Sequence, residues 1–256
     1  MNSRFFFILC LISTSTFAGE VTGTAGTGAQ VEPRYLVDMP TAGILKNGMV
    51  AMDVQFYEMS GMLVSLEAGA FNRLTFGLSY GGTNIIGSGS PDWNRYPGVN
   101  IRFRVFDETE ATPAIAVGFD SQGKDRYLAD SNRYTFKSPG FFASASKYFT
   151  VLGYLGLHGG VNYSLENGDG NKNINFYVGA DKSFGRDISL LFEYNSGIND
   201  NLGNSSNRGL GFINAGVRWS IGGGFTLEFD YKNIFNLRKT SDGSLRVVRL
   251  EYVQAM

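Results

Sequence analysis

The sequence has one cysteine, one histidine and almost no surplus of charge. Cys10 lies in the first apolar stretch, so loss of that stretch would leave a chain without a thiol. Disulfide bonds and thiolate metal sites are therefore excluded from the mature chain. Lysine and arginine number 22 against 23 aspartate and glutamate, which gives a net charge of −1. Nucleic-acid-binding proteins carry a basic excess that neutralises phosphates, so the sequence excludes a nucleic-acid partner.

Long hydrophobic runs are also missing beyond the first residues. No stretch approaches the roughly eighteen apolar residues of a membrane-spanning helix. At the start, Arg4 precedes an apolar core at Phe5–Ile12, and Thr16-Phe17-Ala18 offers small residues for cleavage. This layout predicts a signal peptide over residues 1–18, cleaved near Ala18, and hence an exported protein.

The chain is rich in residues of turns, strands and aromatic belts, with 34 Gly, 21 Phe and 13 Tyr. Residues 19–48 begin with Gly and Thr and predict an N-terminal leader that runs into the first strand. From residue 49 to residue 256, apolar and polar residues alternate with the period of a β-strand. The alternation predicts twelve strands: Met49–Tyr57, Met62–Ala68, Leu74–Tyr80, Val99–Phe106, Thr112–Phe119, Gly140–Phe149, Val151–Leu165, Asn173–Lys182, Asp187–Tyr194, Gly209–Ile221, Phe225–Lys232 and Leu245–Val253.

The connections between these strands alternate between short and long. Short turns are predicted at 69–73, 107–111, 150, 183–186 and 222–224, and longer loops at 81–98, 120–139, 166–172, 195–208 and 233–244. Short turns at one end and long external loops at the other are typical of outer-membrane barrels. The sequence therefore predicts an all-β fold, an up-and-down antiparallel transmembrane β-barrel of about twelve strands. Its last strand is expected to close the ring on Met49–Tyr57.

The two faces of the strands differ in kind. One face carries Val, Ile, Leu and Phe, with aromatic residues near strand ends, as a lipid-facing surface would. The other face carries charged and polar side chains, which would be costly in lipid and are expected to point into the lumen. The lumen-facing candidates are Arg102, Arg104, His158, Glu193, Arg218, Glu228, Asp230, Arg249 and Glu251. These charges are expected either to form a plug of ion pairs or to line a pore.

His158, the only histidine, raises an enzymatic alternative. A barrel-embedded lipid-modifying enzyme would use it as a general base for a serine of the neighbouring strand, Ser144 or Ser146. A hydroxyl within hydrogen-bond reach of His158 would favour this alternative over a polar residue of the lumen wall. A soluble periplasmic β-protein is a third alternative, which a lipid-facing side on every strand would argue against.

Three loop motifs contain residues typical of ligand sites. The oxygen-rich stretch 166–171 lacks the final bidentate glutamate of a calcium loop, and its Asn-Gly and Asp-Gly pairs predict turns. The glycine-rich stretch 81–89 lacks the lysine and helix of a phosphate-binding loop. Aromatic residues in the long loops, among them Trp93 and Tyr96, could stack on sugar rings or anchor the barrel rim. The sequence therefore predicts no catalytic residue, no cofactor and no metal.

Several motifs together resemble the YjbH-like family of bacterial outer-membrane barrels, which is linked to exopolysaccharide export. The resemblance covers most of residues 35–252 and indicates a single barrel unit of that type. The motifs are LVDMPTAG at Leu36–Gly43, GLSYGGTNIIGSGSPDW at Gly77–Trp93, PAIAVGFDSQG at Pro113–Gly123, SKYF at Ser146–Phe149, LHGGVNYSLE at Leu157–Glu166 and LEFDYKNIF at Leu227–Phe235. The resemblance implies an outer-membrane barrel connected with surface polysaccharide, and it implies no site residues.

The sequence as a whole predicts a non-enzymatic protein of the bacterial outer membrane. Its expected role is a narrow channel or a component linked to the export of surface polysaccharide. Its expected partners are outer-membrane lipid, the barrel assembly machinery and polysaccharide.

Overall fold

A computed structural model of the chain describes residues 21–200, 210–235 and 245–256, so the predicted signal peptide at 1–18 lies outside the described residues. Beyond residue 48 the described chain is mostly β-strand, and its one helical element is a short 3-10 turn, η1 (Ala129–Ser131). Within these ranges, no helix has the length and the apolar character needed to cross a membrane.

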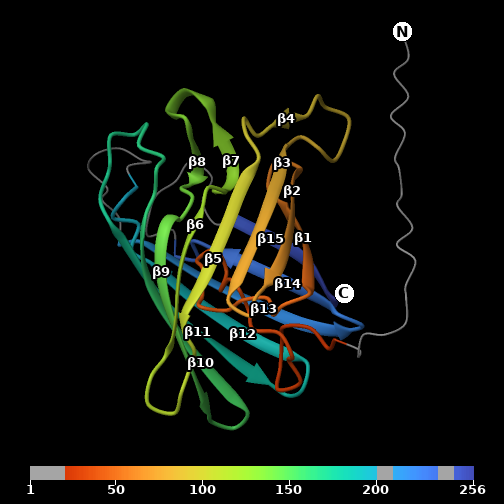
Figure 1. Cartoon of the computed structure of the whole chain (residues 1–256). Coiled ribbons are helices and arrows are strands. Elements are labelled where there is room, and N and C mark those ends of the chain that lie inside the picture. Colours follow the sequence, from red (N-terminus) through yellow and green to blue (C-terminus); the bar gives the residue numbers. More distant parts are fainter. Residues whose placement is uncertain (1–20, 201–209, 236–244) are drawn as a thin grey trace.

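Twelve antiparallel strands form a closed ring (Figure 1). They are β1 (Met49–Tyr57), β2 (Gly61–Ala70), β3 (Leu74–Thr83), β5 (Gly98–Phe106), β6 (Ala114–Asp120), β9 (Gly140–Thr150), β10 (Tyr154–Tyr163), β11 (Asn175–Phe184), β12 (Ile188–Asn195), β13 (Phe212–Gly222), β14 (Phe225–Lys232) and β15 (Leu245–Ala255). Each strand pairs with its neighbours in the chain, and β15 pairs with β1, where Leu250 lies opposite Val54. The predicted fold class and the predicted closure of the last strand on the first are confirmed.

The predicted strand limits agree with the structure to within a few residues, and the clearest difference lies between β9 and β10. There the sequence predicted a turn of the single residue Thr150. In the structure the turn takes three residues, because Leu152 and Gly153 both have positive φ (46° and 101°) and the Val151 amide donates to the Gly153 carbonyl at 3.0 Å. A strand cannot continue through such a turn, so β10 begins at Tyr154 and not at Val151.

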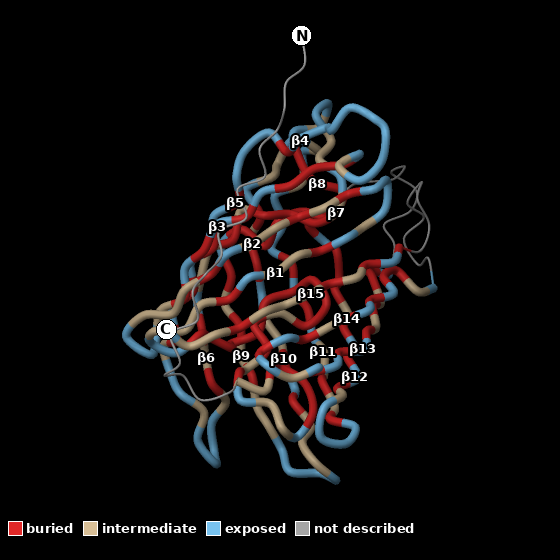
Figure 2. Tube along the Cα trace, turned by 90° about the vertical axis from the view of Figure 1, so that its right-hand side faces the viewer, coloured by how far each residue is buried: buried red, intermediate tan, exposed pale blue. Residues whose placement is uncertain are grey.

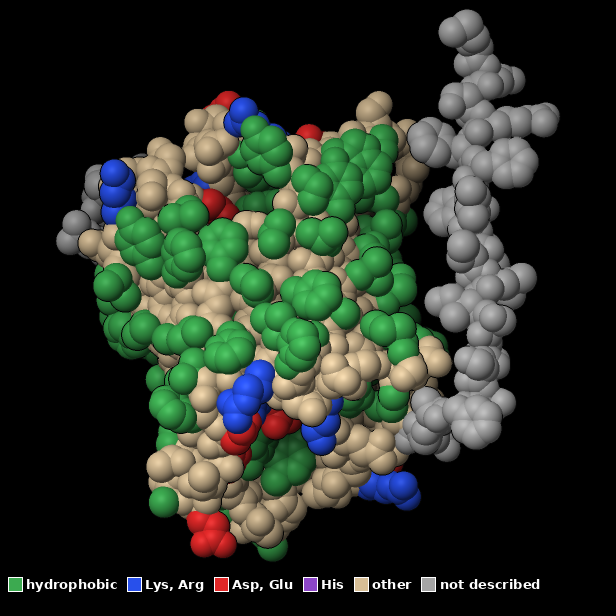
Figure 3. Space-filling view, viewed as in Figure 1, with side chains coloured by type: hydrophobic (Ala, Val, Ile, Leu, Met, Phe, Trp, Pro, Cys, Tyr) green, Lys and Arg blue, Asp and Glu red, His purple; other side chains and the backbone are tan. Residues whose placement is uncertain are grey.

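Buried and exposed residues alternate along the barrel strands (Figure 2). The exposed face is apolar: Leu66, Leu78 and Phe229 expose 58%, 61% and 53% of their surface. Hydrophobic side chains form a broad band over the face shown in Figure 3, with charged side chains above and below it. A soluble monomer rarely exposes so continuous an apolar surface, whereas a barrel in a bilayer requires one. The outer surface therefore argues against a soluble periplasmic protein.

The long loops carry strands that alternation did not predict. β4 (Asp92–Trp93) pairs with the end of β3, while β7 (Lys124–Leu128) and β8 (Arg133–Phe136) form a separate two-stranded sheet. We call residues 124–136 the cap. In Figure 1 the cap lies beyond the ends of the barrel strands, at the end of the barrel where the long loops gather. We call this the long-loop end, and the opposite one the short-turn end.

Candidate functional site

Residues 21–48 enter the barrel, and we call this segment the plug. Its middle, residues 31–45, is mostly buried, whereas Thr27, Gln30, Lys46 and Asn47 nearer its ends are exposed. Leu36, Val37 and Thr41, in this middle part, are completely buried. The sequence predicted a leader that precedes the first strand, but it did not predict that the leader fills the lumen. The interior of this barrel is polar. Arg102, Lys232 and Glu193 are among the largest side chains that are fully buried.

The centre of the plug is a narrow hairpin that enters the lumen. The Leu36 amide donates to the Met39 carbonyl at 2.9 Å, and the Thr41 amide donates to the Arg34 carbonyl at 3.0 Å. An isolated β-bridge joins Tyr35 to Pro40 between these two bonds. The hairpin covers the stretch LVDMPTAG, so this motif forms the tip and the returning arm of the plug.

Side chains of the barrel wall hold the plug mainly by its backbone. Near the short-turn end, three successive amides of the plug donate to wall hydroxyls at 2.9–3.1 Å: Thr24 to Thr226, Ala25 to Ser220 and Gly26 to Ser189. Higher in the lumen, four wall arginines donate to plug carbonyls. These bonds join Arg102 to Arg34 (2.6 Å) and Gly43 (2.8 Å), Arg104 to Ala42 (2.8 Å), Arg218 to Leu36 (3.0 Å) and Arg249 to Val37 (2.9 Å).

Glu193, a negatively charged residue of the wall, binds the tip of the hairpin. Its Oε2 atom accepts hydrogen bonds from the amides of Val37, Asp38 and Met39 at 3.1, 3.0 and 2.9 Å. Its Oε1 atom accepts one from the Asn214 side chain at 2.8 Å. Successive amides that converge on one carboxylate form an anion-binding concavity, so the tip is locked to the wall by a charge-assisted contact.

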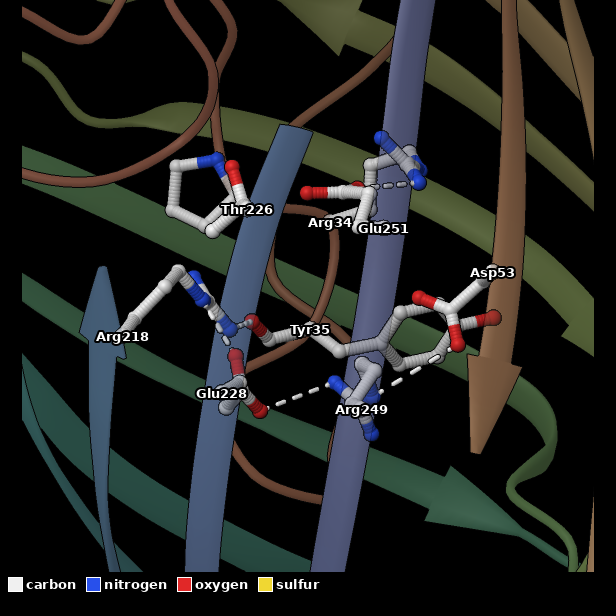
Figure 4. A pocket seen from close by; sticks show the side chains of 9 residues that line it. Arg34, Tyr35, Asp53, Arg218, Thr226, Glu228, Arg249 and Glu251 are labelled. Carbon is white, nitrogen blue, oxygen red and sulfur yellow. Dashed lines mark hydrogen bonds and ion pairs between the residues drawn. The ribbon is translucent and has the colours of Figure 1, made fainter. Parts of the chain in front are cut away.

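Arg34 is the plug's own buried cation. It bonds to Glu67 of β2 and, at 2.6 Å, to Glu251 of β15. Figure 4 shows the neighbouring wall network, in which Glu228 links Arg218 to Arg249 (3.0 Å) and Asp53 lies 3.6 Å from Arg249. Two cavities border Arg34, of about 20 and 30 Å³. Each has room for one or two water molecules, which is too little for a solute to pass beside the plug at this level.

A glycine residue of the wall lets the plug backbone approach closely. A Cβ atom at Gly69 of β2 would lie 2.1 Å from the carbonyl oxygen of Lys46 and 2.4 Å from that of Leu45. A side chain at this position would therefore push the plug away from the wall.

The cap and the neighbouring long loops also carry buried ion pairs. Arg133 of β8 is completely buried and lies 2.7 Å from the carboxylates of Asp169 and Asp200. Burial raises the pKa of Glu166, which accepts the amides of Tyr134 and Ser138, and burial lowers the pKa of Lys137 beside Asp169. The carboxylate of Asp169, in the oxygen-rich stretch 166–171, is thus bound to cations of the protein itself.

The structure places all nine lumen-facing candidates on the inner side of the wall. Arg102, Arg104, Arg218, Arg249 and Glu193 contact the plug backbone, and Glu251 contacts the plug through Arg34, as described above. Glu228 joins two wall arginines. The buried carboxylate oxygens of Asp230 have no hydrogen-bond partner among the described residues.

His158 meets the geometric criterion set by the enzymatic alternative. Its Nδ1 atom lies 2.8 Å from the Ser146 hydroxyl, and its Nε2 atom lies 2.6 Å from the Asp181 carboxylate. All three residues are buried, however, and the Ser146 oxygen also accepts the Ala42 amide of the plug at 2.9 Å. The Ala42 amide thus occupies the Ser146 oxygen, and the trio binds the plug in this structure.

Several residues of this site did not stand out in the sequence. Arg34, Glu67, Asp38 and Lys232 each take part in a buried ion pair. Glu67 and Lys232 lie on strands that the alternation predicted. Their positions on the inner face of these strands were therefore the sequence signal that could have identified them. Arg34 and Asp38 lie in a stretch without periodicity, where no such signal exists.

Comparison with known proteins bears on the fold. No protein-family model and no curated protein matches the chain. Among solved structures, the chain is similar to a KdgM porin, with a TM-score of 0.50 and 10% sequence identity over 80% of this chain and 98% of that one. It also matches a NanC porin structure at a TM-score of 0.44 and 10% identity, over 81% of this chain and 99% of that one. The fold is thus that of an outer-membrane porin, a closed barrel of twelve antiparallel strands.

Proposed function

We propose that this protein is a non-enzymatic channel of the bacterial outer membrane whose pore is closed by its own plug. One observation carries the proposal: polar side chains of the wall bind the backbone of the plug along its length. Four arginines, seven hydroxyls and one glutamate bind plug amides or carbonyls. Without the plug, these groups would line a hydrophilic passage.

A purely structural barrel has little need of such an interior. Replacing buried ion pairs by packed apolar side chains is often neutral or stabilising. A lumen wall rich in arginine, glutamate and serine is therefore better explained by a water-filled state in which these groups are solvated. The plug supplies their partners in the closed state.

The cellular setting of the proposed channel is the one that the sequence predicts. Export would remove residues 1–18 near Ala18, the barrel assembly machinery would insert the chain, and outer-membrane lipid would surround the apolar band. The long-loop end would face the outside. The resemblance to YjbH-like barrels adds a finer proposal, that the channel serves surface polysaccharide.

Bilayer conductance of the refolded protein tests the channel. The full chain is expected to conduct little, and a chain lacking residues 21–47 is expected to conduct steadily, because its lumen is empty. A synthetic peptide of residues 21–47 added to the short-turn side should close the shortened barrel again. A peptide of the same composition in scrambled order should not. A folded barrel that conducts equally little with and without the plug would contradict the proposal.

A further inference from the structure

One buried side chain joins the plug to the cap. Lys232, at the end of β14, places its Nζ atom 2.9 Å from the Asp38 carboxylate of the plug and 3.0 Å from the Asp125 carboxylate of the cap. The same nitrogen lies 4.4 Å from the centre of the Phe136 ring, which also belongs to the cap. Lys232 is completely buried, so both carboxylates help to offset the cost of removing its charge from water.

A second contact joins the same two elements directly. The Lys124 ammonium of the cap lies 4.9 Å from the centre of the Tyr35 ring in the plug hairpin. The Tyr35 hydroxyl donates to Asp120, at the end of β6, at 3.0 Å. The chain runs from Asp120 into β7 within four residues, so the cap strand starts beside the plug.

We propose that the cap and the plug are coupled, so that displacement of the cap by an extracellular ligand loosens the plug. This inference rests on the proposed function in taking the plug as the closing element. The solvation of Lys232 explains why displacement of the cap loosens the plug. If the cap leaves, Lys232 loses Asp125 and gains water, and water screens its attraction to Asp38. Lys232 then holds the hairpin tip less strongly. By linkage, release of the plug must loosen the cap by the same factor.

Thiol labelling measures the coupling in the full chain. With Cys10→Ser as background, Ala42→Cys places a thiol on the buried plug, where a membrane-impermeant reagent reacts only after release. Asp125→Asn weakens the hold of Lys232 on the cap, so that the cap opens more often and water reaches the Lys232–Asp38 pair. It is expected to raise the labelling rate by about 5- to 150-fold, the usual range of coupling between sites, although it changes no residue of the plug. Asp130→Asn is the matched control, since it removes an exposed carboxylate from the same cap. It is expected to leave the rate unchanged.

The reverse direction is measured with the thiol on the cap. Asp38→Asn in the plug should likewise raise the labelling of Thr135→Cys, a buried cap position, because a loosened plug loosens the cap. Heat-modifiability on gels shows that each barrel is folded. If Asp125→Asn gives no folded barrel, this reverse measurement decides the question.

Two results would overturn the coupling. One is labelling of Ala42→Cys in Asp125→Asn at the rate of the Asp130→Asn control. The other is a double variant Asp38→Asn, Asp125→Asn whose rate is the product of the two single effects, because independent contacts multiply. Failure of the channel proposal would look different: a plug-deleted barrel without conductance leaves these labelling rates as they are.

Discussion

Replacing Arg34 by methionine should release the plug while the barrel stays folded. Arg34 is the only plug residue that reaches both Glu67 and Glu251, and its side chain exposes 3% of its surface. Methionine removes the charge and leaves two buried carboxylates without their cation, on the strands β2 and β15 that flank β1. Breaking a buried ion pair in this way costs about 3–5 kcal/mol. The plug-in state loses that amount relative to the released state, in which water solvates both carboxylates.

The shift in the plug equilibrium follows from this cost. At about 1.4 kcal/mol for each factor of ten, release becomes roughly 100- to 4,000-fold more favourable. The assay is the labelling of Ala42→Cys by an impermeant thiol reagent in the folded protein, together with conductance in a bilayer. Both should rise with Arg34→Met. Adding Glu67→Gln and Glu251→Gln should restore part of the closure, because no uncompensated charge is then buried.

The matched control is Arg73→Met at the short-turn end. Arg73 also forms an ion pair, at 2.8 Å from Asp107, but the two side chains expose 45% and 58% of their surface. A pair so exposed contributes at most about 1 kcal/mol. If Arg34→Met labels no faster than Arg73→Met, the burial of the Arg34 pairs does not hold the plug, and the reasoning is wrong.

Three further predictions concern the lipid face, the close approach of the plug and the cap. Leu190→Arg on the exposed face of β12 should cost about 2–4 kcal/mol of unfolding free energy in vesicles, measured by urea titration, and Leu152→Arg in the β9–β10 turn about 1 kcal/mol or less. Gly69→Val should expel the base of the plug and raise Ala42→Cys labelling, because its Cβ would meet a plug carbonyl at 2.1 Å. Gly159→Ala, whose Cβ has no neighbour nearer than 3.5 Å, should not. Burial raises the pKa of Glu166 above 4.5, so Glu166 binds its proton more tightly when its loop is folded against the cap than when the loop is unfolded. The contribution of Glu166 to the stability of the cap is therefore full below pH 4.5 and falls as the pH rises. Glu166→Gln should remove this fall, as measured by protease cleavage of the cap at several pH values; an unchanged slope would mean that another group titrates.

The barrel could be predicted from the sequence because its strands face two different media. On β13, Val217 faces outward and Arg218 inward, and the alternation of such pairs reports which side each residue takes. The number of alternating segments between the turns and loops then gives the number of strands. Here local sequence and global fold depend on the same periodicity, so the one predicts the other.

The plug could not be predicted because its structure does not depend on periodicity. Its carbonyls are satisfied by Arg102 and Arg249, which lie far away in the chain, and its tip is held by Glu193. A stretch that bonds to wall side chains needs neither helical nor strand alternation. The contact between His158 and Ser146 could be proposed from cross-strand neighbours, but the Ala42 amide that occupies Ser146 comes from the plug and had no sequence signal.

The plug also constrains the order in which the chain can fold. Arg34 contacts Glu251, 217 positions further along the chain, and Thr24 contacts the same residue across 227 positions. The plug is therefore synthesised first, but its binding site is complete only after β15 has paired with β1. Contacts between residues so distant in sequence form late and slowly, because the loop between them must be ordered first. The contacts of Arg34 and Thr24 with Glu251 can therefore form only in the last stage of folding, and the hold of the wall on the plug is complete only in the closed ring.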